Sequence, residues 1–408
     1  MNAIIGSKSY ERWFRIADGL AVALAVVMPW STSATAILAV LWLFTILPLL
    51  SLSDLRCELT TAAGGLPVLL ALLGAAGMLW ADVSWPEKFH GVDAFAKLLL
   101  LPLLLAYFRQ SGGGTAVFGG YLTSCAILMA ASWVHWLWPG LLPHAHVGAV
   151  TRNLETQSGE FVTCVFPLLW IVADMIERRR YTVAAGAGLL ALGFLADIFF
   201  VGTARTSLVV IPVLLVLFGV RRLSLRGSLL LLAAGAVLAA AVWASSPVLR
   251  ERVLRISTEL HSYELTNKRT SSGERLEFWK KSIAFVRAAP LIGHGTGTIP
   301  KLFREAAHGS GVTAVASTNP HNQTFVIAIQ LGLVGVVVLW AMWIAHVLLF
   351  RGEGLAPWIG LVVVVQNIVG SLFNSHLSDF VQGWVYVVGV GVAGAMMRRI
   401  PNSPASER

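Results

Sequence analysis

Residues 323–350 read QTFVIAIQLGLVGVVVLWAMWIAHVLLF, a run without Asp, Glu, Lys or Arg. A helix needs about 20 mostly apolar residues to cross a membrane, so this run is long enough to span one. The whole chain shares the bias: its 408 residues are 56% hydrophobic and 12% charged, and the mean hydropathy is +0.74. Soluble globular proteins carry about 25% charged residues. Composition therefore predicts an all-α, polytopic membrane protein and excludes a soluble enzyme, a disordered chain and a fibrous protein.

The same criterion finds twelve candidate membrane-spanning segments along the chain. They are 13–30, 34–50, 66–82, 93–108, 115–138, 158–176, 182–201, 206–220, 227–245, 323–350, 356–373 and 381–397. The arginines test this count, because cytoplasmic loops carry an excess of Lys and Arg. With the N-terminus inside, every cytoplasmic junction carries at least one Arg, from Arg56 and Arg109 to the cluster at 178–180. We therefore predict twelve spans with both termini in the cytoplasm.

One connection, residues 246–322, is far longer than the others, and the alternation places it on the outer side. Its first part carries apolar residues at spacings of four and three, which predicts an amphipathic helix. These residues are Leu249, Val253, Ile256, Leu260 and Tyr263. A second helix is predicted to begin at Ser271, which has capping-box spacing to Glu274, and to end at Pro290. The glycines that follow between 293 and 297 predict a flexible stretch.

The chain thus divides into three parts. Residues 1–245 hold the first nine predicted transmembrane helices, residues 246–322 form the outer loop with its amphipathic helices, and residues 323–408 hold helices ten to twelve and a cytoplasmic tail. The outer loop alone has room for structure outside the membrane. We expect it to cover whatever site the helices form on that side.

Polar side chains recur near the outer ends of the predicted helices. Ionisable groups at membrane depth are costly, so they mark candidate functional sites. The residues are Asp93, Lys97, Arg152, Asp197, Arg205, Arg275, His294, His321, His376 and Asp379. They predict one outward-facing polar site roofed by the loop. Asp93 and Lys97 stand one helical turn apart, and an alternative is that they pair with each other.

His321 is the most informative of these residues. It lies in Asn319-Pro320-His321-Asn322-Gln323, just before the long apolar run. Asn319 is predicted to cap that helix, with Pro320 at its first position and His321 in its first turn. The helix dipole there disfavours positive charge, so we expect a lowered pKa and a neutral imidazole, suited to act as a general base. The alternative is a histidine that forms only an interfacial hydrogen bond.

Two arginines have the chemistry to bind phosphate groups. Arg205 follows a very short turn between two predicted helices, which places it at the outer membrane boundary. Arg275 lies near the start of the second loop helix. A guanidinium can bind phosphate oxygens through two parallel hydrogen bonds. The alternatives are snorkelling to lipid headgroups for Arg205 and plain solvation for Arg275.

Other motifs exclude several functions. The stretch from Gly293 to Gly297 follows no strand and lacks the Lys of a Walker motif, so we predict no nucleotide site, although His294 could line the polar site. The three cysteines show no metal-ligand spacing, and no metal or other cofactor is expected. The net charge of +9 serves mainly to orient helices and not to bind nucleic acid; the surplus suits anionic lipids or phosphorylated substrates.

Three motifs together resemble the O-antigen ligase (WaaL) family, within the wider group of O-antigen ligases and polymerases. They are Arg275-Leu276-Glu277-Phe278-Trp279, then Pro290-Leu291-Ile292-Gly293-His294-Gly295, then Pro320-His321-Asn322-Gln323. Their order inside a large external loop flanked by many helices carries the resemblance, which covers the whole topology. It implies a membrane glycosyltransferase of the all-helical GT-C type in the bacterial inner membrane, with its active site facing the periplasm.

The resemblance also implies the reaction, a step of lipopolysaccharide biosynthesis. The family transfers a glycan from undecaprenyl diphosphate to a sugar hydroxyl of lipid A–core, and its essential residues would fall on Arg205, Arg275 and His321. We expect metal-independent, inverting transfer with His321 as general base. The predicted substrate-binding residues are Arg205, Arg275, Asn322, His294, Arg152, Lys97 and Asp379. The expected partners are the lipid-linked donor, the lipid A–core acceptor and membrane lipids, with no nucleotide and no nucleic acid.

Two other functions stay open from the sequence. An O-antigen polymerase would use the same donor and extend a second lipid-linked glycan. A lipid or glycan transporter would carry broken helices and polar groups near the bilayer midplane. The placement of polar residues at outer helix ends, beside one large loop, favours the transferases.

Overall fold

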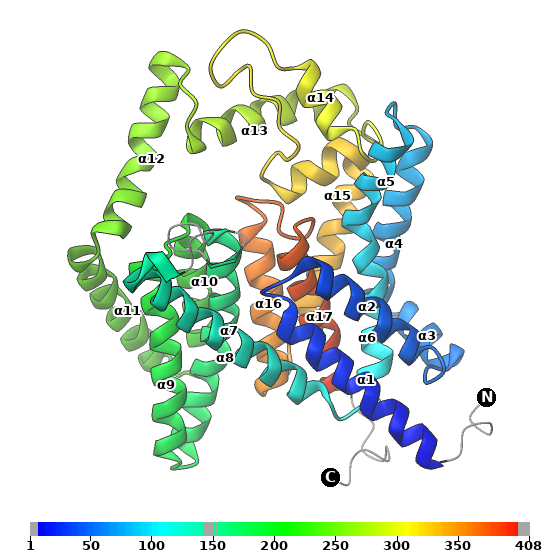
Figure 1. The fold of residues 1–408 in the computed structure, drawn as a ribbon, viewed down its shortest axis with the longest axis vertical. Helices are drawn as coiled ribbons and strands as arrows, with labels where there is room; N and C mark the ends of the chain where they lie inside the picture. Colours follow the sequence, from blue (N-terminus) through cyan, green and yellow to red (C-terminus); the bar gives the residue numbers. More distant parts are fainter. Residues whose placement is uncertain (1–6, 142–149, 152, 399–408) are drawn as a thin grey trace.

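The computed structural model describes residues 7–141, 150–151 and 153–398. Within these ranges the chain forms helices and loops without a strand, as the composition predicts. The α-helices are α1 Ser7–Val27, α2 Thr32–Ile46, α3 Leu52–Leu59, α4 Ala62–Ala76, α5 Trp85–Ala96, α6 Leu100–Phe108, α7 Gly114–Leu137, α8 Leu154–Glu177, α9 Tyr181–Ala196, α10 Arg205–Arg222, α11 Leu225–Ser245, α12 Pro247–Thr266, α13 Ser271–Ala288, α14 Ile299–Glu305, α15 Gln323–Leu349, α16 Leu355–Gly370 and α17 Phe380–Met397 (Figure 1). Short turns of other helix types are η1 Gly77–Leu79, η2 Lys97–Leu99, η3 Pro139–Leu141 and η4 Asp197–Val201.

All twelve predicted apolar segments coincide with helices. Among the described residues, eight helices are long and apolar enough to cross a membrane, and α2 and α16 are shorter apolar helices. The protein is therefore a multi-pass membrane protein, while the count of twelve spans stays a prediction. The segment predicted at 93–108 is the second half of one longer span, Trp85–Phe108, in which η2 joins α5 to α6.

Helix α17 lies at the centre of the bundle. Every residue from Val381 to Ala395 is buried, because α6, α8 and α16 surround it. Glycines permit the close approach: a Cβ at Gly391 would lie only 2.5 Å from Cβ of Leu104. Helix α11 is the opposite case, since only Val242 is buried among its apolar residues. A helix that is apolar on all sides and uncovered by protein faces lipid.

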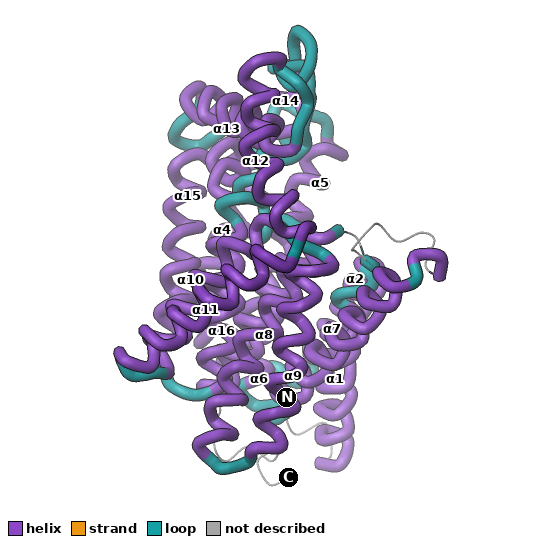
Figure 2. The backbone as a smooth tube through the Cα atoms, turned by 90° about the vertical axis from the view of Figure 1, so that its left-hand side faces the viewer, coloured by secondary structure: helices purple, strands orange, loops and turns teal. Residues whose placement is uncertain are grey.

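Helices α12, α13 and α14 lie together beyond one end of the bundle (Figures 1 and 2). We call α12 and α13, residues 247–288, the arch. A small core of Phe278, Ile299, Phe303, Val326 and Ile329 fastens α13 and α14 to α15. Helix α12 buries only Leu249. The second helix begins at Ser271 as predicted, but its N-cap is Thr270, whose side chain accepts from the Gly273 N–H, so the predicted capping box of Ser271 and Glu274 is wrong.

The glycine-rich stretch after the arch is firmly held, contrary to the predicted flexibility. Helix α15 is broken at Gly332, where φ is +61°, and the chain from Pro290 to Gly295 packs into the break. The N–H of Leu333 donates to the Pro290 carbonyl, and the N–H of Gly295 donates to the Gln330 carbonyl. A Cβ at Gly293 would lie 2.5 Å from the backbone of Gln330, so glycine is required there.

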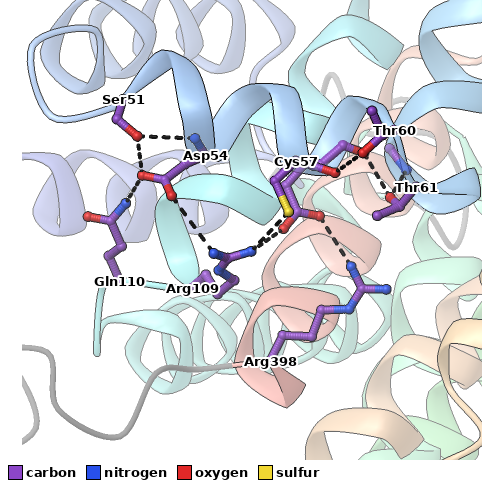
Figure 3. A network of polar contacts seen from close by, with 10 residues as sticks. Ser51, Asp54, Cys57, Thr60, Thr61, Arg109, Gln110 and Arg398 are labelled. Carbon is purple, nitrogen blue, oxygen red and sulfur yellow. Dashed lines mark hydrogen bonds and ion pairs between the residues drawn. The ribbon is translucent and has the colours of Figure 1, made fainter.

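A polar network surrounds α3 (Figure 3), which lies at the end of the bundle away from the arch (Figure 1). Glu58, on α3, is almost fully buried, and its carboxylate accepts from Arg109 at 3.0 Å and from Arg398 at 3.2 Å. Asp54 accepts from Gln110 at 2.9 Å. The network joins α3 to the ends of α6 and α17. Arg56 and Arg109, two of the arginines predicted to be cytoplasmic, therefore lie at the end of the bundle opposite the arch.

Candidate active site

Arg205 joins the bundle to both helices of the arch. It is the first residue of α10, and a short turn separates it from η4. Its side chain therefore extends from the bundle at the end nearest the arch. Its two terminal nitrogens donate to the two carboxylate oxygens of Glu259 on α12, each at 3.0 Å. One of them also donates to Oγ of Ser272 on α13, at 2.8 Å. The guanidinium therefore binds this carboxylate in a bidentate manner, through two hydrogen bonds.

Glu259 is a site residue that the sequence analysis missed. Besides Arg205, its carboxylate accepts from the Ser272 N–H at 3.0 Å and from the Ser272 hydroxyl at 2.6 Å. Burial opposes ionisation of Glu259, but the hydrogen bonds from Arg205 and Ser272 outweigh it and lower the pKa of the carboxyl. Glu259 is therefore held as an anion at the beginning of α13.

Arg275, the second predicted arginine, approaches a different carboxylate. Its nearest guanidinium nitrogen lies 3.8 Å from Glu155, which stands near the beginning of α8. Glu155 also accepts from the Thr206 hydroxyl at 2.9 Å and lies 3.5 Å from Nε2 of the buried His376. Glu155 was missed as well, although its place at the outer end of a predicted helix is the same signal that selected the other candidates. It connects α8, α10, α13 and the loop between α16 and α17.

His321 lies outside the helix that the sequence predicted for it. The N-cap of α15 is Asn322, whose side chain accepts from the Phe325 N–H, and the helix begins at Gln323. Asn319 does not cap the helix, because its side-chain oxygen accepts from the His321 N–H and from the Ser375 hydroxyl. This turn gives His321 a φ of +54°, in the left-handed region that non-glycine residues rarely adopt.

The surroundings of the imidazole prepare one of its nitrogens as a base. Its Nδ1 lies 3.0 Å from the side-chain oxygen of Asn374, and its ring stacks on Phe278 with 6.2 Å between centroids. An amide oxygen only accepts, so Nδ1 carries the hydrogen and the lone pair is on Nε2. Burial lowers the pKa of His321, and the nearby positive charge of Arg275 lowers it further. The expected direction is confirmed, and burial of the imidazole is its largest cause.

The loop between α16 and α17, residues 371–379, holds several predicted residues in place. Asn322 donates to the Leu372 carbonyl, so both ends of its amide are engaged with backbone. Asp379 caps α17 by accepting from the Gln382 N–H. Lys97 does not pair with Asp93: its ammonium group donates to the Asp379 carbonyl at 2.6 Å, because its buried side chain reaches this loop.

His294 is not brought into contact with the cluster. His294 Nε2 lies 2.9 Å from the Phe285 carbonyl, on the far part of α13, and no contact joins it to Arg205, Arg275 or His321 in the described part of the chain. Arg152 lies outside the described residues. The prediction that both line the site stays untested.

The cluster combines two guanidinium groups with one neutral imidazole at the junction of bundle and arch. Such a set can bind an anionic leaving group and accept a proton. Between residues 7 and 398, apart from the masked positions, no group of three or more His, Cys, Asp or Glu side chains is arranged to hold a metal ion.

Comparison with protein families adds one finding. Residues 190–340 match the family model described as O-antigen ligase. Over this segment the chain is similar to the O-antigen ligase family. The resemblance drawn from the three motifs is thereby confirmed, and the O-antigen ligase segment contains Arg205, Glu259, Arg275 and His321. The family indicates a glycosyltransferase-like ligase or polymerase activity. No curated protein matches the chain. Glu155 and Asn374, which complete the cluster, lie outside the matched segment.

Proposed function

We propose that this protein is an O-antigen ligase of the bacterial inner membrane. It transfers a glycan from undecaprenyl diphosphate to a sugar hydroxyl of lipid A–core. The observation that carries the proposal lies within the O-antigen ligase segment. Arg205 of that segment pairs with Glu259 and Arg275 approaches Glu155, and the charge of Arg275 acts on His321.

The two arginines would bind the donor's diphosphate. This group carries about two negative charges, and the charge on the leaving oxygen grows as the sugar–phosphate bond breaks. In the described structure each arginine faces a carboxylate, which supports their preference for anions. The hydroxyls of Ser272 and Thr206 lie beside the same carboxylates and can donate to phosphate oxygens as well.

His321 would act as the general base. Its Nε2 takes the proton of the acceptor hydroxyl while the hydroxyl oxygen attacks the anomeric carbon of the donor sugar. The bond from that carbon to the phosphate oxygen breaks, and undecaprenyl diphosphate leaves with the electron pair. A single displacement of this kind inverts the anomeric carbon. The Asn374 contact supports this role, because it fixes the hydrogen on Nδ1.

The proposal includes the membrane arrangement predicted from the sequence. It has twelve spans, residues 246–322 in the periplasm between the helix groups 1–245 and 323–408, and a GT-C-type architecture. The separation of the arch from the arginine network at the opposite end of the bundle supports it (Figures 1 and 3). A periplasmic site fits lipid-linked glycans, which need no nucleotide once the diphosphate supplies the driving force.

Reconstitution with two acceptors tests the function. The purified protein, in liposomes with the undecaprenyl-diphosphate-linked glycan, is offered lipid A–core or a second lipid-linked glycan. We expect the glycan to move to lipid A–core and the His321→Ala variant to serve as the inactive control. Extension of the lipid-linked glycan alone would identify a polymerase. Exchange across the bilayer without a new glycosidic bond would overturn the transferase proposal.

A further inference from the structure

The beginning of α13 forms a complete anion cradle. The guanidinium of Arg205 supplies two N–H donors, and Ser272 supplies its backbone N–H and its hydroxyl, all directed at one carboxylate. The backbone donor belongs to the second residue of an 18-residue helix, where unpaired N–H groups and the helix dipole favour an anion. Proteins bind phosphate with this same set of donors: a guanidinium, a backbone N–H at a helix N-terminus and a hydroxyl.

The occupant of this cradle is a side chain of the protein itself. Glu259 is 12% exposed and fills the space where a phosphate would bind. It is carried by α12, the helix of the arch that buries only Leu249, so the bundle core does not fix Glu259 in position. The other arginine is held less tightly, because the 3.8 Å between Arg275 and Glu155 exceeds hydrogen-bond distance.

We propose that Glu259 is an internal competitor of the donor: it occupies the phosphate cradle of Arg205 and Ser272, and one phosphate of the diphosphate displaces it on binding. This inference rests on the proposed function. A carboxylate carries one negative charge, as does the phosphodiester of an ordinary phospholipid. The diphosphate carries about two and also reaches Arg275, so it displaces Glu259 where a phospholipid headgroup does not. Glu259 thus makes the cradle selective for the donor.

Binding of inorganic pyrophosphate to the purified full-length protein tests this competition. Glu259→Gln keeps the size of the side chain and removes its charge. If Glu259 fills the cradle about nine-tenths of the time, the variant should bind pyrophosphate about tenfold more tightly by calorimetry. Glu264→Gln, an exposed change on the same helix, is the matched control and should leave binding unchanged. Glu259→Asp, which keeps the charge on a shorter side chain, should give a smaller gain and covers the case that Glu259→Gln does not fold.

Arg205→Lys separates this inference from the function on which it rests. We expect it to weaken pyrophosphate binding in both the wild-type and the Glu259→Gln background. If Arg205→Lys weakens pyrophosphate binding but Glu259→Gln does not strengthen it, Glu259 does not compete with phosphate. The phosphate site at Arg205 is then still supported. If Glu259→Gln weakens binding, Glu259 supports the cradle instead of competing for it, and the inference fails. If Arg205→Lys leaves pyrophosphate binding unchanged, the proposed phosphate site itself is wrong.

Discussion

The imidazole of His321 and the side-chain oxygen of Asn374 lie 3.0 Å apart, although 53 positions separate the two residues in the chain. The contact joins the turn before α15 to the loop between α16 and α17. It sets the tautomer of the histidine, because the amide oxygen accepts the Nδ1 hydrogen. The predictions that follow begin with this pair.

Replacing His321 by alanine should remove general-base help. That help is typically worth about 10²–10⁴-fold in rate, so the turnover of His321→Ala should fall by this factor while donor binding persists. Activity should rise with pH through the pKa of His321, which burial places below its ordinary value, and should level off above it. This acidic limb should vanish in the variant. Retention of more than about a tenth of wild-type turnover would make the residue structural.

Asn374 should tune the base without touching the donor. Its hydrogen bond favours the charged imidazole and so raises the pKa of His321 against the effect of burial. Asn374→Leu should therefore move the acidic limb to lower pH and reduce kcat about tenfold, or about 1.4 kcal/mol of barrier. Asn374→Asp should move the limb to higher pH. Identical pH–rate profiles in both variants would show that the contact does not govern the base.

Conservative changes should expose the need for two-pronged binding. Arg275→Lys and Arg205→Lys keep the charge but lose the planar fork. We expect a large loss of activity in each, with the fold intact by thermal unfolding. Arg178 is exposed and follows the last residue of α8, at the end of that helix away from Glu155. Arg178→Lys therefore provides a matched control of the same chemistry. Near wild-type turnover in both Arg205→Lys and Arg275→Lys would remove the phosphate-binding role.

The topology can be read from cysteines at the two ends of the molecule. Cys57 is exposed in the network of α3, whereas Cys125 and Cys164 are buried. A membrane-impermeant maleimide should label Glu264→Cys, in a Cys57→Ser background, in intact spheroplasts. The native Cys57 should react only after permeabilisation and so reports the other side. The reverse pattern would invert the predicted orientation.

The Glu58 network should contribute to stability and not to catalysis. Its carboxylate is buried and neutralises Arg109 and Arg398. Glu58→Gln leaves Arg398 without its counter-charge and leaves Arg109 only its 3.8 Å contact with Asp54. Because the arginines are partly exposed, we expect a loss of about 1–3 kcal/mol. The melting temperature of the detergent-solubilised protein should fall while turnover below that temperature is unchanged. The exposed Glu353→Gln serves as the control.

The helices were predictable because the signal for them is local. Each of the twelve apolar segments is long enough to identify a helix from its own residues. The start of α15 was not, because Asn319 and Asn322 are both good capping residues. The side chain of Asn319 is instead engaged by the His321 N–H and by Ser375, a residue of a distant loop.

The cluster was predictable in part for the same reason. Arg205, Arg275 and His321 stand out as unusual residues near helix ends or inside motifs. Glu259 and Glu155 do not, since an acidic residue on a polar helix face or in a first turn is ordinary. Their importance comes from partners 54 and 51 positions away, which no local pattern encodes.

The break in α15 dictates an order of assembly. Leu333 and Val334 lie beyond the break, and their N–H groups are satisfied by the carbonyls of Pro290 and Leu291, which leave the ribosome earlier. Without these partners, bare backbone groups would remain beside lipid, at a cost of several kcal/mol each. The longest apolar helix therefore reaches its final form only after the chain at Pro290 and Leu291 has packed into its break.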